Sequence, residues 1–484
     1  MNNQISRPSR LLLLSLSVLM FVSACATNPV TGGLQLAKSE AWELEAGAQY
    51  HQEILKQYQV YDDPELQAYV NEIGQRLAAK SHRSDLKWTF TLLDSPEVNA
   101  FALPGGYTYI TRGIMAYMNK ESHLAGVIGH EIGHVTARHG AQRAAQQQVA
   151  GIGAVGVAIL TGSNELAQAS QMLGGALMSG YGREQELQSD RLGAEYIAKN
   201  NYNVDEMLGV ISILKNQELF AAEKARAEGR EQQAYHGLFS THPDNDKRLR
   251  EVVKAADKFR DVTEPIPDDG KFLRLTNGMA FGESESQGIT RGNKFYHKDL
   301  DLFLEFPEGW SIVNQPSQLV AVSPDRSQAI AMRMDSSQGA NSQAYLRSKF
   351  QPLSSQQSVD TAFGEASAAI ATLSDESTGQ QRNIRVSAIP RGNQTFLILG
   401  QGQNTLPNQD FFDVVKSVRG LKSNEQKLAS GSRIQLVTAK QGDTFAKLAQ
   451  QANIGSYAEE QLRLINDMYP TGEPTPGQQI KILK

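Results

Sequence analysis

The feature that most constrains this chain is a pair of histidines four residues apart, with a glutamate directly after the first. The stretch "VIGHEIGHVTARHG", residues 127–140, contains His130, Glu131 and His134. Residues four apart share one face of an α-helix, so both imidazoles can reach one ion, and Glu131 can address a metal-bound water. Apolar residues at 124, 127, 128, 132 and 135 predict that helix. The alternative interpretation is two hydrogen-bonded histidines on an ordinary helix.

A third metal ligand is expected in the helical stretch 182–200, which contains several carboxylates. Helical periodicity places Glu186 and Asp190 on one narrow face, together with Gly193, Ala194 and Ile197. Carboxylates on such an inward face are costly unless they are paired or bind metal. We therefore predict Glu186 as the third ligand and Asp190 as the acceptor for a ligand histidine's other N–H group. The alternative, a solvated helix, is disfavoured by the small and apolar neighbours.

The N-terminal residues have the pattern of a targeting segment. Arg7 and Arg10 precede an apolar run, residues 11–22, which is too short to span a bilayer and suits the core of a signal peptide. The run leads into "VSAC", which resembles the bacterial lipobox. This predicts residues 1–24 as a lipoprotein signal peptide and Cys25, the one cysteine of the chain, as the lipidated residue. The alternative is a stray cysteine near an ordinary cleavage site.

A lipidated Cys25 implies a periplasmic protein held at a membrane by its acyl chains, without a spanning helix. The next residue is Ala26 rather than aspartate. By resemblance to the sorting signals of bacterial lipoproteins, this favours the outer membrane.

At 484 residues the chain is expected to form two or three domains. Residues 25–260 are helix-rich, apart from residues 86–113, which predict two or three short strands with a turn at Pro104-Gly105-Gly106. After an acidic linker at 261–270, residues 270–422 predict an α+β domain that ends in a helix. Residues 422–432 predict a polar linker before a small module at 433–484. The predicted fold class is therefore multi-domain: a mainly α domain that contains the histidine pair and a small edge sheet (α+β), then an α+β domain and a small βααβ module.

Residues 149–181 are rich in Gly, Ala and Met and carry one charge, at Glu165. They could form a membrane span, but the apolar core is short and contains glycines that weaken a helix. A helical pair beside the active site is the favoured interpretation.

The order His130-Glu131-x-x-His134 followed by Glu186-x-x-x-Asp190 resembles the HtpX/BepA-type family of zinc metallopeptidases, relatives of the CAAX prenyl proteases. The stretches "NAFALPGGYTYITRG" and "STHPDNDKRLR" fit the same family in order and spacing, so the resemblance covers roughly residues 35–256. It implies Zn²⁺ as the cofactor, protein substrates, and Glu131 as the general base.

The resemblance also implies roles for residues outside the helix. The strand near Asn99, Ala100, Phe101 and Ala102 is expected to offer its edge to an extended substrate. His242 of "STHP" lies close to the metal in this family, which implies regulation or oxyanion support; the alternative is a loop histidine that caps a helix. His139 is nine residues from His130, on the opposite face of a continuous helix, and is interpreted as structural.

Residues 433–484 resemble the LysM module, a small fold that binds peptidoglycan. The matching residues are Gly442-Asp443-Thr444, Leu448-Ala449, Leu464, Asn466 and Pro476-Gly477. Peptidoglycan is therefore a candidate partner. The alternative is that the module packs against the protease domain or binds a protein.

Two classes of function follow. The first is a membrane-anchored zinc endopeptidase that cleaves misfolded or misassembled envelope proteins. The second is a peptidoglycan-associated lipoprotein that acts as a chaperone or scaffold for envelope assembly. Scattered basic residues and a net charge of −5 argue against a nucleic-acid partner.

Overall fold

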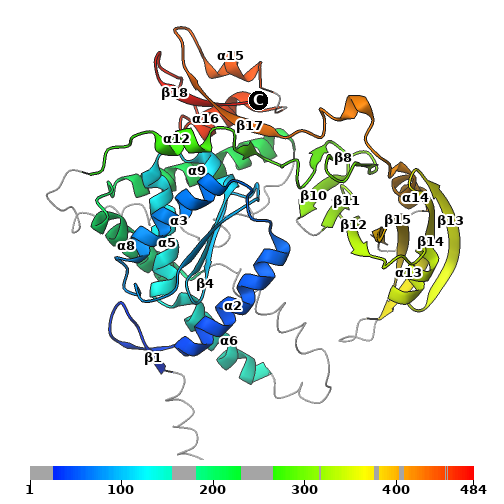
Figure 1. Ribbon diagram of the computed structural model, residues 1–484, viewed down its shortest axis with the longest axis horizontal. Helices are drawn as coiled ribbons and strands as arrows, with labels where there is room; N and C mark the ends of the chain where they lie inside the picture. Colours follow the sequence, from blue (N-terminus) through cyan, green and yellow to red (C-terminus); the bar gives the residue numbers. More distant parts are fainter. Residues whose placement is uncertain are drawn as a thin grey trace, which may run out of the picture. The chain divides into compact units, whose positions relative to one another are not determined.

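The computed structural model describes residues 25–154, 181–229 and 265–484, except 316–317, 375–380, 403–407, 453 and 455 (Figure 1). The chain divides into two compact units. The first contains the described residues up to Met279 together with Arg433–Lys484, and the second contains Ala280–Ser432. Both combine helices with sheets, in agreement with the predicted multi-domain α+β class. Within the described ranges, the helices are all too short or too polar to cross a membrane.

The helices of the first unit are α2 (Glu40–Gln57), α3 (Pro64–Ala78), α4 (Arg112–Tyr117), α5 (Glu121–Thr136), α6 (His139–Ala154), α8 (Arg183–Lys199), α9 (Glu206–Ala227), α12 (Lys271–Thr276), α15 (Phe445–Ala449) and α16 (Ala458–Ile465). Its strands are β1 (Cys25–Thr27), β2 (Leu34–Leu36), β3 (Thr89–Leu93), β4 (Ala100–Leu103), β5 (Tyr107–Thr111), β17 (Ser432–Thr438) and β18 (Gln479–Leu483).

A three-stranded sheet lies next to the central helices of this unit (Figure 1). Its order is β3-β5-β4, with β5 parallel to β3 and antiparallel to β4, so β4 is an edge strand. The predicted turn at Pro104–Gly106 joins β4 to β5, and Gly105 and Gly106 adopt φ angles of 83° and 96°, which favour glycine. The turn packs closely on α2, since a Cβ on Gly47 would lie 2.0 Å from the carbonyl oxygen of Pro104.

Helix α5 forms the centre of the first unit. All its residues from His123 to Thr136 are buried, and it packs against α3, α8, α9 and strand β4. Such an all-round apolar environment is the reason why the helix sequence is rich in small and aliphatic residues. Polar side chains on this helix must therefore find partners inside the protein.

The second unit is built on a seven-stranded antiparallel sheet of order β10-β11-β12-β16-β15-β14-β13. Its strands and helices are β6 (Ala280–Phe281), β7 (Ile289–Arg291), β8 (Lys294–His297), β9 (Leu302–Glu305), β10 (Ser311–Gln315), β11 (Gln318–Val322), β12 (Gln328–Ser336), α13 (Ser342–Lys349), β13 (Leu353–Thr361), β14 (Gly364–Ser374), β15 (Gln381–Arg391), β16 (Gln394–Gly402), α14 (Asn408–Ser417) and the 3₁₀ turn η2 (Ser423–Glu425). The helix predicted to close this domain is present as α14.

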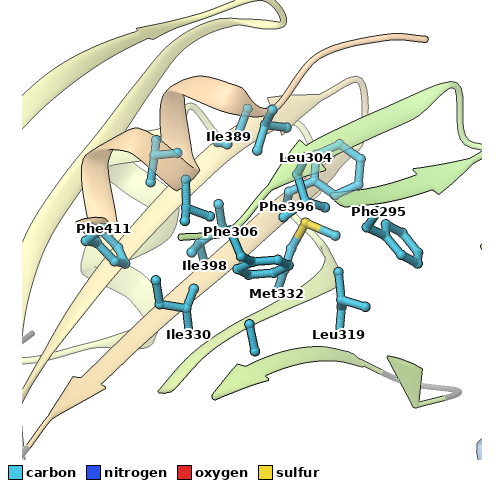
Figure 2. Close-up of a cluster of buried hydrophobic side chains, with 14 of the residues drawn as sticks. Phe295, Leu304, Phe306, Leu319, Ile330, Met332, Ile389, Phe396, Ile398 and Phe411 are labelled. Carbon is cyan, nitrogen blue, oxygen red and sulfur yellow. The ribbon is translucent and has the colours of Figure 1, made fainter. Parts of the chain in front are cut away.

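Helix α14 packs over this sheet and closes a core of aromatic and aliphatic side chains (Figure 2). Phe306, Phe396 and Phe411 lie in that core together with Ile330 and Met332. Within the described part of this unit no cluster of three histidine, cysteine or carboxylate side chains could hold a metal.

The predicted polar linker at 422–432 is wrong for most of its length, because these residues fold onto the second unit. Arg419 forms a bidentate ion pair with Glu425, at 2.7 and 2.8 Å. The side chain of Arg291 donates to the carbonyl oxygens of Leu428 and Ser430, and Ala429 is fully buried. The polar composition of the segment reflects these local contacts rather than a free linker.

Candidate metal centre

His130 and His134 lie one turn apart on α5, and their Nε2 atoms are 3.0 Å from each other. Both imidazoles are buried. The two nitrogens face the same point, as the four-residue spacing predicts for one helix face.

The second helix of the site, α8, approaches α5 through glycines. A Cβ on Gly133 would lie 2.9 Å from the Ser189 carbonyl oxygen, and a Cβ on Gly193 would lie 2.9 Å from the amide nitrogen of His130. A Cβ on Gly129 would lie 3.2 Å from the Gly193 carbonyl oxygen. The two backbones are therefore in direct contact, and carboxylates on α8 can reach the histidines of α5.

Glu186 and Asp190 on α8 both point into this contact and are 0% and 2% exposed. Glu186 Oε2 lies 3.6 Å from His130 Nε2, and Glu186 Oε1 lies 3.5 Å from His134 Nε2. Asp190 Oδ1 lies 2.8 Å from the other nitrogen of His130, Nδ1. The structure therefore brings together the four residues that the periodicity of the sequence places on facing helix surfaces.

The separations within this cluster suit a small divalent cation. Ligand atoms from His130, His134 and Glu186 all lie within 4.8 Å of one another. Two atoms placed about 2.05 Å from a tetrahedral ion are about 3.3 Å apart, close to the observed 3.0 to 3.6 Å. Two imidazoles and one carboxylate are also donors that transition metals accept. The three residues thus fit a metal ion.

Asp190 determines which nitrogen of His130 is available to a metal. When Nδ1–H donates to Asp190, the Nε2 lone pair is directed toward His134 and Glu186. Burial alone would lower the pKa of His130, but the hydrogen bond and charge of Asp190, together with the charges of Glu186 and Glu131, raise that pKa above its ordinary value.

His139 also belongs to the site, and its interpretation as a histidine on the far side of a continuous helix is wrong. Helix α5 ends at Thr136, and Arg138 adopts a left-handed φ of 62°, so the chain turns before α6 begins at His139. The buried Arg138 is held in this turn by Glu43 Oε2, 2.9 Å from its Nε. The turn brings His139 Nδ1 to 2.9 Å from His134 Nδ1.

His139 completes a hydrogen-bonded chain that begins at Gln188. The Nε2 atom of His139 lies 3.1 Å from Gln188 Oε1, and its Nδ1 atom faces His134. Burial lowers the pKa of His139 to about 4, so its ring is neutral at pH 7 and one nitrogen accepts. When the Nε2–H group of His139 donates to Gln188, the Nδ1 atom of His139 accepts a hydrogen bond from the Nδ1–H group of His134. His134 then presents the lone pair of its Nε2 atom to a metal.

Replacing His139 with alanine is expected to weaken metal binding by about 10- to 100-fold, the usual effect of losing a residue that orients a ligand. The measurement is zinc competition against a chromophoric chelator. Gln188→Glu keeps an acceptor and should retain affinity, whereas Gln188→Leu should lose it. His51→Ala is the matched control, because His51 contacts Tyr109 rather than the ligands. Equal affinity in the His139 and His51 variants would contradict the assigned role.

Glu131 is 1% exposed and follows His130 on α5. Its charge acts on both His130 and Tyr181. Tyr181 stacks on the ring of His134, with ring centroids 3.9 Å apart, and the Arg143 guanidinium lies 4.1 Å from the centroid of Tyr181. Sequence reasoning missed Tyr181, because an aromatic residue before a helix has no characteristic spacing to the ligands.

The residues expected to bind substrate lie on and next to the edge strand. Ala100, Phe101 and Ala102 belong to β4, and Asn99 precedes it. Thr111 Oγ1 donates to the carbonyl oxygen of Asn99 at 2.7 Å and so ties β4 to the end of β5. Strand β4 packs against α5, the helix of the histidines.

Some predicted residues fall outside the described ranges. These are His242, the segment 1–24 and most of the Gly- and Ala-rich stretch 149–181. Cys25 is the first residue of β1, where it pairs with Leu36 of β2.

The helix His130-Glu131-x-x-His134, completed by a glutamate from a second helix, is the arrangement of a metallopeptidase. Comparison with known proteins gives the family: residues 64–256 match the family model described as Peptidase family M48. This part of the chain is an M48 metallopeptidase domain.

Several curated proteins are similar to the same region. The beta-barrel assembly-enhancing protease of Escherichia coli is 26% identical over 242 residues, which cover 47% of this chain and 46% of that protein. A putative beta-barrel assembly-enhancing protease of Vibrio cholerae is 32% identical over 192 residues, which cover 37% of this chain and 39% of that protein. The mitochondrial metalloendopeptidase OMA1 of Schizosaccharomyces pombe is 30% identical over 192 residues, which cover 38% of this chain and 51% of that protein. The chain thus spans about half the length of these relatives.

Proposed function

We propose that the chain is a periplasmic zinc metalloendopeptidase that cleaves misfolded or misassembled proteins of the bacterial envelope. The observation that carries this proposal is the buried convergence of His130, His134 and Glu186 beside Glu131. The names of the bacterial relatives support an envelope substrate, because they describe proteases that enhance β-barrel assembly.

His130, His134 and Glu186 would hold the metal, and Asp190 and His139 would orient the two imidazoles. Zinc is the expected ion, because catalytic zinc sites use three nitrogen or carboxylate ligands and leave one position for water. When bound, zinc supplies a Lewis acid that lowers the pKa of water and polarises a carbonyl group.

Glu131 is the proposed general base. Its carboxylate takes a proton from the attacking water and delivers it to the nitrogen of the leaving amine. The buried position of Glu131 excludes bulk water that would otherwise compete for this proton. His242 remains a proposed contributor to regulation or oxyanion support.

The edge of β4 is the proposed binding site for an extended substrate. An unfolded segment can add to an exposed sheet edge through main-chain hydrogen bonds, which do not depend on the substrate's sequence. This mode suits misfolded proteins, since they share an accessible backbone rather than a common side-chain motif.

The test of this proposal is digestion of an unfolded protein such as casein by the zinc-loaded chain, compared with the Glu131→Gln variant. Casein that stays intact with the zinc-loaded wild type would contradict the proposed activity.

The proposed anchor is an acyl group on Cys25. Replacing Cys25 with serine should release the protein into the soluble periplasmic fraction, or leave its signal unprocessed, because serine cannot carry the thioether-linked lipid. Fractionation followed by mass spectrometry of the N-terminal peptide is the measurement. Wild-type protein that is extracted in soluble form without detergent would contradict the anchor.

Binding of peptidoglycan by residues 433–484 is a proposal that rests on the resemblance to LysM modules alone. The module has the order β17, α15, α16, β18, with the two strands antiparallel. Its contacts with the protease domain favour the alternative interpretation, in which the module packs against that domain.

A further inference from the structure

Outside the metal centre, a lysine is buried where the C-terminal module, residues 433–484, contacts the protease domain. Both belong to one compact unit, and α16 packs against α4 and α9. Lys481 of β18 is 1% exposed. Lysine is rarely buried to this degree, because an ammonium group is costly to remove from water without partners.

The partners of Lys481 are two main-chain carbonyl groups of the protease domain. Its Nζ atom donates to Ala116 O at 2.6 Å and to Met118 O at 2.8 Å. These carbonyls lie at the C-terminal end of α4, where a helix has unsatisfied acceptors that favour a cation. Burial lowers the pKa of Lys481, and the charge of Asp467 opposes that shift.

Further contacts of the same interface surround this lysine. Gln461 of α16 donates to the Tyr117 hydroxyl at 3.0 Å. The Tyr469 hydroxyl donates to a carboxylate oxygen of Glu223 on α9. Phe220 of α9 makes an edge contact with the ring of Tyr469, with centroids 6.0 Å apart. The module is therefore attached by polar and aromatic contacts at two helices.

Helix α4 is the connection between the substrate-edge sheet and the metal-binding helix. It follows β5 directly, and Thr111 is both its N-cap and the residue that bonds Asn99 at the start of β4. Helix α5 begins at Glu121, four residues after α4 ends. At its start α4 is tightly packed, since a Cβ on Gly113 would lie 2.1 Å from the Glu97 carbonyl oxygen. Lys481 holds its other end.

We propose that residues 433–484 act as an intramolecular brace, and that Lys481 is a positioning residue that fixes the edge strand β4 relative to the metal-binding helix α5. The brace would set which peptide bond of an extended substrate lies at the metal. This role rests on the proposed peptidase function, although its structural half can be measured without activity.

The experiment compares full-length Lys481→Met with Lys447→Met. Methionine keeps the length of the side chain but cannot donate to the two carbonyls. Lys447 is a matched control because its Nζ donates to Gly442 O within the module. We expect Lys481→Met to lower the melting temperature by about 5 °C and to speed hydrogen exchange at residues 99–103 and 112–124 by at least about tenfold. Zinc content should stay unchanged, and cleavage of an unfolded substrate should spread to bonds next to the main sites.

Unchanged hydrogen exchange and an unchanged cleavage map, even with a lower melting temperature, would overturn the positioning role. Tyr469→Phe provides a milder variant, in case Lys481→Met fails to fold. It removes only the hydrogen bond to Glu223 and should accelerate exchange in the same segments; no acceleration would count against the brace. Wild-type protein without peptidase activity would refute the proposed function, while hydrogen exchange would still decide whether the brace exists.

Discussion

Replacing Glu131 with glutamine is expected to reduce proteolysis by at least about 100-fold, while leaving the fold and the metal content intact. Glutamine has nearly the same shape as glutamate but cannot take a proton from water at neutral pH, so it removes the general base alone. The similar shape of the two side chains matters because Glu131 and its neighbours on α5 are all buried, so a side chain of another shape would disturb the packing. The measurement is casein digestion by zinc-loaded protein, together with elemental analysis and a melting curve.

Glu184→Gln is the matched control for this experiment, because Glu184 is exposed on α8. It should retain wild-type proteolysis. Activity of the Glu131 variant close to that of wild type would overturn the assigned role. The Glu131→Gln variant also separates the two classes of function. A chaperone or scaffold does not need a general base, so in that case the variant would support envelope assembly as well as the wild type does.

Replacing His134 with alanine is expected to reduce bound zinc from one ion per chain to almost none. The variant removes one of three protein ligands and leaves a buried space between His130, Glu186 and Tyr181. Two remaining ligands do not make the three-ligand set of a catalytic zinc site. The measurement is elemental analysis after exhaustive dialysis.

The control for this variant is His51→Ala, which removes a partly buried histidine at a distance from the ligands and should keep its zinc. Equal zinc content in the His134 variant and the wild type would count decisively against the site. A melting curve is needed for both variants, because loss of metal also removes the stability that binding supplies.

Much of the metal centre could be predicted from the sequence, because its residues follow the period of a helix. The spacing of His130 and His134 and the shared face of Glu186 and Asp190 are local properties of α5 and α8. His139 could not be predicted in the same way. Its contact with His134 depends on where α5 ends, and that depends on the left-handed Arg138 held by Glu43 from a distant helix.

The brace was equally inaccessible to sequence reasoning. In "QQIKILK", Lys481 lies between two isoleucines, and strand alternation predicts that it points to solvent. The structure buries it, because two carbonyl groups more than 360 positions earlier in the chain act as its acceptors. Secondary-structure propensity and hydrophobic periodicity describe residues that are neighbours along the chain. The contact of Lys481 joins residues that become neighbours only in the folded protein.

The glycine contact between α5 and α8 has a mechanical consequence for the metal centre. At Gly129, Gly133 and Gly193 the helices touch through their backbones, with no layer of side chains between them. Side chains can change rotamer and absorb a small displacement, but two backbones in contact cannot. The separation between the histidine-bearing helix and the carboxylate-bearing helix is therefore set by backbone contact, so a cation of larger radius would have to be accommodated by the side chains of His130, His134 and Glu186 alone.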